Sequence, residues 1–152
     1  LAFFKAEEAA QQRLPTTGTV LITLSEKDRS AVPEIGKGFA QLGFKIIATE
    51  GTHRFLAEHG VQSEHILKLH EGRPNIVDAI KNGEIQLVIN TPSGKLSKYD
   101  DSYIRKSAVT YRVPYITTPA AALAAVRGIE AYTRDHDFVK SLQEHHRDIK
   151  SD

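Results

Sequence analysis

The chain contains no cysteine and no methionine among its 152 residues. Without cysteine it can form neither a disulfide nor a zinc–thiolate site, and this composition fits a reducing compartment, so we expect a cytoplasmic protein. Without methionine it has no initiator residue, so we expect a piece of a longer protein. No apolar run approaches the roughly 18 residues needed to span a bilayer, and no signal-peptide pattern opens the chain.

Net charge is nearly absent as well. The sequence has 20 lysine and arginine residues against 19 aspartate and glutamate residues, for a formal net charge of +1. Such a balance argues against a broad nucleic-acid surface, so any basic chemistry must be local. Hydrophobic residues make up 40% and charged residues 26% of the chain, which is typical of a globular protein and, at this length, of one domain.

Short apolar runs alternate with helical patterns from residue 18 onward. The run from Thr19 to Leu24 is rich in β-branched residues and indicates a buried strand, whereas apolar residues recur at helical spacing from Asp28 to Leu42. The same signals predict further strands at 44–48, 65–69, 87–89 and 114–116. They predict further helices at 52–59, 75–81, 103–111, 120–127 and 139–149, with Gly128 ending the fourth of these.

This alternation predicts an α/β fold, a three-layer doubly wound sandwich with a five-stranded, mainly parallel sheet. Residues 1–17 read as a linker or as the tail of a preceding domain, because a short amphipathic segment is closed by Pro15 and Gly18. Residues 18–152 would then form one domain.

Ligands of such a sheet bind outside the carboxyl ends of its strands, and a polar turn follows each predicted strand. The turn from Thr49 to Thr52 has the strongest anion-binding character. Gly51 lets backbone N–H groups approach an anion, the two threonines offer hydroxyl donors, and the next helix points its positive end at the same place. Gly51 can also serve only the turn, and Thr52 can serve only as a helix cap.

Three further residues follow neighbouring strands. Arg29 and Lys68 would add positive charge, and Asn90 carries both donors and acceptors, which suits a sugar hydroxyl or a base edge. Taken singly, the two cations can be solvated surface charges and Asn90 can bond its own turn. Their convergence on one edge of the sheet favours a phosphate site with a polar neighbour.

The other chemical signals are weak. His145 and His146 would point about 100° apart on a helix, and the remaining histidines have no ligand spacing, so we expect no metal site. No dinucleotide fingerprint, Walker loop or nucleophile elbow is present, and we expect no cofactor. Tyr99, Asp100 and Asp101 are expected to form a turn that starts the next helix.

Several segments together resemble the C-terminal methylglyoxal-synthase-like domain of the carbamoyl phosphate synthetase large subunit. They are residues 48–52, 69–78, 80–84, 88–91 and 104–108. The His-Glu-Gly-Arg-Pro run and the Lys-Asn-Gly-Glu turn are specific to this subfamily, whereas Thr-x-Gly-Thr is shared more widely. Even Phe4-Lys5-Ala6-Glu7 resembles the tail of the preceding domain, so the likeness covers essentially the whole chain.

The resemblance implies a regulatory domain that is not itself an enzyme, within an ATP-dependent ligase of pyrimidine and arginine biosynthesis. The family binds nucleotide monophosphates, UMP as an inhibitor and in some members IMP as an activator. Its phosphate and ribose contacts match Arg29, Thr49, Thr52, Lys68 and Asn90. Tyr115 and Thr117 match positions that touch ornithine at a domain boundary. The implied partners are the rest of the large subunit, the glutaminase small subunit and, in a homo-oligomer, further copies.

At two positions this sequence departs from the family's pattern in ways that bear on which nucleotide is bound. Arg29 replaces a lysine of several relatives, and Pro92 replaces a threonine, which removes a hydroxyl and a backbone N–H from the implied pocket. The rival functions are a methylglyoxal synthase, a cyclohydrolase-type enzyme and a purely structural or oligomerisation module. The lyase needs a carboxylate base, but Glu71 stands in a stretch that lacks the Gly-Gly-Asp motif of that enzyme.

Overall fold

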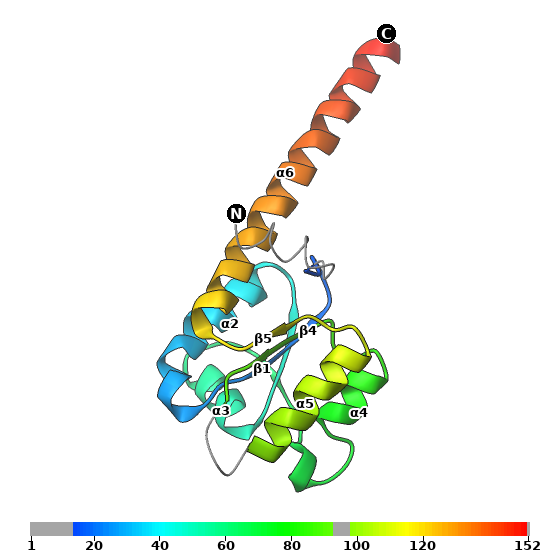
Figure 1. Ribbon diagram of the computed structural model, residues 1–152. Coiled ribbons are helices and arrows are strands. Elements are labelled where there is room, and N and C mark those ends of the chain that lie inside the picture. Colours follow the sequence, from blue (N-terminus) through cyan, green and yellow to red (C-terminus); the bar gives the residue numbers. More distant parts are fainter. Residues whose placement is uncertain (1–13, 93–97, 152) are drawn as a thin grey trace.

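The computed structural model describes residues 14–92 and 98–151 (Figure 1). The arm expected at residues 1–17 therefore lies almost entirely outside the described residues, as does the Phe4 to Glu7 segment. Within the described part of the chain, no helix combines the length and the apolar character needed to cross a membrane.

Five strands form a single sheet in the order β3-β2-β1-β4-β5, and each pairing is parallel. The strands are β1 (Thr19–Thr23), β2 (Lys45–Ala48), β3 (Glu64–His65), β4 (Leu87–Asn90) and β5 (Tyr115–Ile116). Central strand β1 is buried from Val20 to Ile22, which is why its sequence is continuously apolar rather than alternating. The predicted α/β fold is confirmed, with a sheet that is parallel throughout.

Helices cover both faces of this sheet (Figure 1). On one face lie α2 (Val32–Gln41), α3 (Glu50–Glu58) and α6 (Pro119–Ser151), and on the other α4 (Ile76–Lys81) and α5 (Lys98–Thr110). Side chains of a strand point alternately to opposite faces, so Val20 and Ile22 join the first core cluster and Leu21 the second. Two short 3-10 helices, η1 (Glu26–Ala31) and η2 (Leu69–Glu71), follow β1 and β3.

The winding of the chain reverses at β1. From β1 the chain builds outward through β2 to β3, and then crosses back to place β4 on the other side of β1. The connections that leave the carboxyl ends of β1 and β4 therefore diverge to opposite faces, and a crevice forms between them. This topology decides where a ligand site can form.

Helix α6 differs from its prediction. Gly128 does not end it, and the separate helix expected at 139–149 is wrong, because one helix runs from Pro119 to Ser151. Ile129 is fully buried and continues the apolar stripe of Ala122 and Ala125, so core packing outweighs the roughly 1 kcal/mol that a helical glycine costs. The helix projects well beyond the rest of the domain (Figure 1).

The third strand is also shorter than predicted. Residues 66–69 do not continue the strand, because pairing with β2 ends at His65. Beyond it, Leu67 bridges to Asn75 and its carbonyl accepts the N–H of Ile76 at 3.0 Å, so the chain turns away from β2. Lys68 consequently lies at the start of η2 rather than inside a strand.

Candidate functional site

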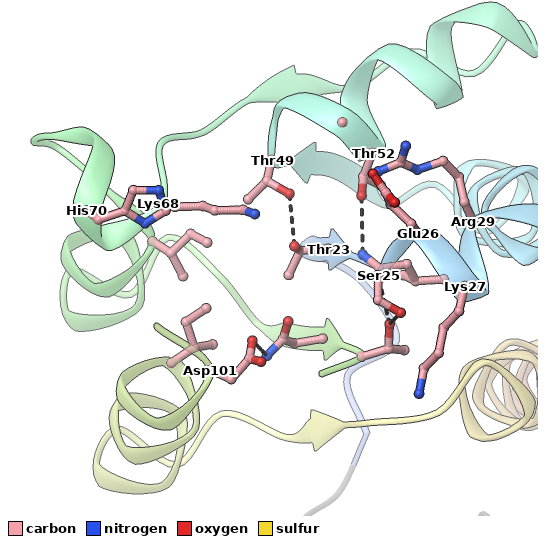
Figure 2. A pocket seen from close by; sticks show the side chains of 16 residues that line it. Thr23, Ser25, Glu26, Lys27, Arg29, Thr49, Thr52, Lys68, His70 and Asp101 are labelled. Carbon is pink, nitrogen blue, oxygen red and sulfur yellow. Dashed lines mark hydrogen bonds between the residues drawn. The ribbon is translucent and has the colours of Figure 1, made fainter. Parts of the chain in front are cut away.

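A cavity of about 520 Å³ lies at the carboxyl ends of β1, β2 and β4 (Figure 2). All of the effector-binding residues predicted from the sequence line it. These are Arg29, Thr49, Gly51, Thr52, Lys68 and Asn90. The remaining lining residues are Thr23, Leu24, Ser25, Glu26, Lys27, His70, Ile76, Thr91, Asp101 and Ile104. The structure thus brings the predicted residues together, while their binding of an effector stays a prediction.

The N-terminus of α3 forms one wall. Thr49 precedes the helix in extended conformation, so the N–H groups of the first turn have no helical acceptor. A Cβ added to Gly51 would lie 2.7 Å from Nη2 of Arg29, which means that the guanidinium packs directly over the backbone of Gly51. The φ of Gly51 is not positive, so the missing side chain serves close approach rather than the turn.

Arg29 reaches this place from η1, not from the strand end itself. Its Nε is buried and has no hydrogen-bond partner in the described part of the chain. A buried donor without an acceptor is unfavourable, so an anion beside the guanidinium would relieve that cost. Arg29 therefore lines the cavity with an unsatisfied buried donor, and its role as an anion contact stays a prediction.

Buried hydroxyl groups tie the strand ends together. The hydroxyls of Thr23 and Thr49 share a 2.8 Å hydrogen bond, and the N–H of Leu24 donates to Oγ1 of Thr52 at 3.2 Å. Thr52 therefore accepts from the segment after β1 instead of capping its own helix, and its hydroxyl hydrogen remains to be donated. The sequence did not single out Thr23, although a threonine that ends a buried strand next to a polar turn is a usable signal.

The loop after β4 contributes Thr91. Its Oγ1 accepts the N–H of Ser25 at 2.8 Å, which joins the exits of β1 and β4. Pro92 is exposed and is absent from the cavity lining, so the expectation that it lies inside the pocket is wrong for the described residues. Successive residues of extended chain point to opposite sides, and Thr91 is the one that points inward.

Lys68 closes another side of the cavity. Figure 2 shows its side chain extending toward Thr49. Its backbone N–H donates to Oε1 of Glu71 at 2.7 Å, and Glu71 does not line the cavity. The carboxylate that the sequence offered as a lyase base is thus engaged outside the site.

The end of the cavity near Asn90 is polar and buried. Nδ2 of Asn90, a residue only 2% exposed, donates to Oδ1 of Asp101 at 3.1 Å and to the hydroxyl of Tyr115 at 2.8 Å. Burial raises the pKa of Tyr115; the charge of Asp101 also raises it, while the Asn90 hydrogen bond and Arg105 oppose the rise. Both amide hydrogens of Asn90 are used in this network.

Asp101 is the main residue that the sequence interpretation missed. It was expected in a turn, but α5 starts at Lys98 and Asp101 lies in its first turn, facing the cavity. Of the two residues proposed for ornithine, Tyr115 bonds Asn90, and Thr117 is exposed and absent from the lining. The described residues contain no group of three or more histidine and acidic side chains that could hold a metal ion.

Comparisons with known proteins agree with this architecture. The family model of the MGS-like domain matches residues 31–117. The carbamoyl phosphate synthase large chain of Archaeoglobus fulgidus is 49% identical over 149 residues, which is 97% of this chain and 14% of that protein. The C-terminal section of the Aquifex aeolicus large chain is 47% identical over 145 residues, 95% of this chain and 27% of that protein.

Among solved structures, the methylglyoxal synthase of Elizabethkingia anophelis superposes with a TM-score of 0.60 at 20% identity, covering 74% of this chain and 79% of that one. The chain itself spans only 14% of the length of full-length relatives such as the Archaeoglobus protein. The resemblance inferred from the sequence is confirmed. With its parallel sheet in the order 3-2-1-4-5 and a family match over most of that sheet, the chain belongs to the MGS-like domain family.

Proposed function

We propose that this chain is the allosteric regulatory domain of a cytoplasmic carbamoyl phosphate synthase large chain. Its cavity would bind a nucleoside monophosphate effector, UMP or IMP. The observation that carries the proposal is the cavity at the strand ends, where Arg29, Lys68 and the N-terminus of α3 converge. Relatives that are 39–49% identical over nearly the whole chain carry the synthase name.

The phosphate would bind at the α3 end of the cavity. Helix N-termini bind anions through free N–H groups and the helix dipole, and charged hydrogen bonds from Arg29 and Lys68 would add to this. The hydroxyl of Thr52 supplies a further donor, because accepting the N–H of Leu24 leaves its own hydrogen available. A volume of about 520 Å³ lies within the usual range for small-ligand pockets.

Regulation then requires coupling to the rest of the synthase, an ATP-dependent ligase that also has a glutaminase subunit. Coupling free energies between sites are typically about 1–3 kcal/mol. In this proposal the domain itself is not catalytic. Tyr115 and Thr117 would contact ornithine at the boundary with the neighbouring domain.

Calorimetric titration with UMP and IMP tests the effector site. Binding is expected, and Lys68→Ala should weaken it by about 1.5–3 kcal/mol through loss of a charge-assisted bond. Lys45→Ala is the matched control. Lys45 begins β2, so it lies at the amino ends of the strands, away from the cavity, and it forms an ion pair with exposed Glu64. No heat and no thermal shift at millimolar nucleotide would leave the structural-module alternative.

The alternative of a phosphate lyase has one observation in its favour, the similarity to the methylglyoxal synthase fold. Against it, Glu71 lies outside the cavity. Two other carboxylates line the cavity, those of Glu26 and Asp101, and Asp101 already accepts a hydrogen bond from Asn90. Incubation with dihydroxyacetone phosphate should release no phosphate above background. Turnover that depends on Asp101 would replace the regulatory assignment.

A further inference from the structure

One buried acceptor at the polar end of the cavity has no donor among the described residues. Asn90 uses both amide hydrogens, one on Oδ1 of Asp101 and the other on the hydroxyl of Tyr115. The second carboxylate oxygen, Oδ2 of Asp101, is buried and has no hydrogen-bond partner among the described residues. A buried acceptor without a donor costs free energy, and the cost is greatest for a charged group. Among the described residues, the unliganded site therefore offers no donor to Oδ2 of Asp101.

A bound phosphate cannot supply this donor. Phosphate oxygens accept hydrogen bonds, and an anion beside a carboxylate is repelled. Arg29 and the helix N-terminus also draw the phosphate elsewhere. Arg29 lies on the opposite side of the cavity from Asp101 in Figure 2, and its guanidinium packs against Gly51 in the first turn of α3. The missing donor must come from another part of the ligand.

We propose that Asp101 recognises the vicinal hydroxyl groups of the ligand's sugar and so selects ribonucleotides over nucleotides that lack them. This inference rests on the proposed nucleotide site. A carboxylate that accepts from a ribose hydroxyl is a recurrent solution in nucleotide-binding folds. Asn90 then orients the carboxylate by donating to Oδ1, and a hydroxyl of the ligand's sugar donates to Oδ2, which Asn90 leaves without a partner.

A ligand-based double-mutant cycle tests the proposal. The chain is titrated calorimetrically with UMP and with 2′,3′-dideoxyuridine 5′-monophosphate, which differ only in the hydroxyls. The wild-type chain should bind UMP roughly 10- to 100-fold more tightly, the worth of a charge-assisted hydrogen bond. In Asp101→Ala this preference should fall to within about threefold, because the acceptor is gone.

Asp101→Asn is a second variant for the case that Asp101→Ala does not fold. Its side-chain oxygen can still accept the hydrogen bond from Asn90, which preserves that contact. It should keep the fold, by circular dichroism, and lose most of the preference. Inorganic phosphate should bind both variants as it binds wild type, because the phosphate contacts are untouched. Asp137→Ala, at an exposed site on α6, should behave as wild type.

The outcomes separate the two proposals. Equal binding of both nucleotides by the wild-type chain, or an undiminished preference in both folded Asp101 variants, would overturn the role of Asp101 and leave the nucleotide site intact. Binding of neither nucleotide at millimolar concentration would instead reject the nucleotide site itself.

Discussion

At the residue scale, the anion end of the cavity depends on the contact between Arg29 and Gly51. An alanine at position 51 fits helical backbone and has a higher helix propensity than glycine, so Gly51→Ala should leave the fold at least as stable. Its Cβ would lie 2.7 Å from Nη2 of Arg29 and would displace the guanidinium. We expect nucleotide affinity to fall by about 1–2 kcal/mol, measured by calorimetry alongside the melting temperature.

The double variant Gly51→Ala/Arg29→Ala controls for this mechanism. If the alanine acts only by displacing Arg29, the double variant should bind no more weakly than Arg29→Ala alone. Fully additive losses would show that Gly51 contributes in another way.

Tyr115 should make stability depend on pH in the alkaline range. Burial raises its pKa in the folded domain, so the neutral phenol is favoured by folding. The stabilisation of the folded domain by the neutral phenol is complete below the ordinary tyrosine pKa near 10. It is lost as the pH rises through the higher pKa that Tyr115 has in the folded domain. The stability difference between wild type and Tyr115→Phe should therefore shrink above about pH 10 in urea titrations. A constant difference from pH 8 to pH 11 would contradict this.

At the element scale, α4 is a helix of 6 residues that needs its cap. The side chain of Asn75 accepts the N–H of Val77 at 3.0 Å and donates to the carbonyl of Gly72 at 2.9 Å. Because Asn75 is also 3% exposed, Asn75→Ala would leave buried polar groups unpaired. We expect a loss of about 1–3 kcal/mol in the free energy of unfolding, measured by denaturant titration.

The opposite end of α4 provides the matched control. Asn82, the C-cap residue, is exposed and caps through its backbone N–H, so Asn82→Ala should change stability by less than about 0.5 kcal/mol. Equal losses for both variants would mean that the cap of Asn75 is not the source of the stability.

How well a helix or strand could be predicted depended on the strength of its apolar pattern. Strand β1 and helix α2 carry strong apolar patterns and were predicted within a few residues. Strand β3 carries almost none, because only two residues pair at the sheet edge and both are exposed. Helix α6 was misread at Gly128 because local propensity was given more weight than the buried Ile129 that follows.

At the scale of the whole molecule, the core ends partway along α6. Phe39 is 0% exposed and packs edge-on against Phe44 with 5.3 Å between ring centroids, whereas Phe138 on the projecting part of α6 is 63% exposed. Phe39→Ala should cost about 3–5 kcal/mol of unfolding free energy. The same change at Phe138 should cost less than about 0.5 kcal/mol. Comparable losses in denaturant titrations would place the outer part of α6 within the cooperative core.

The sequence by itself determined the alternating elements, and with them the parallel sheet and the edge at which polar residues gather. Apolar period and turn chemistry are local properties, so they can be read without coordinates. Which distant residues become neighbours was decided only by the tertiary structure. The order of strands puts β4 beside β1, which brings Thr91 to Ser25, and the packing of α5 brings Asp101 to Asn90. Such contacts depend on strand order and helix placement, which the spacing of residues along one chain does not encode.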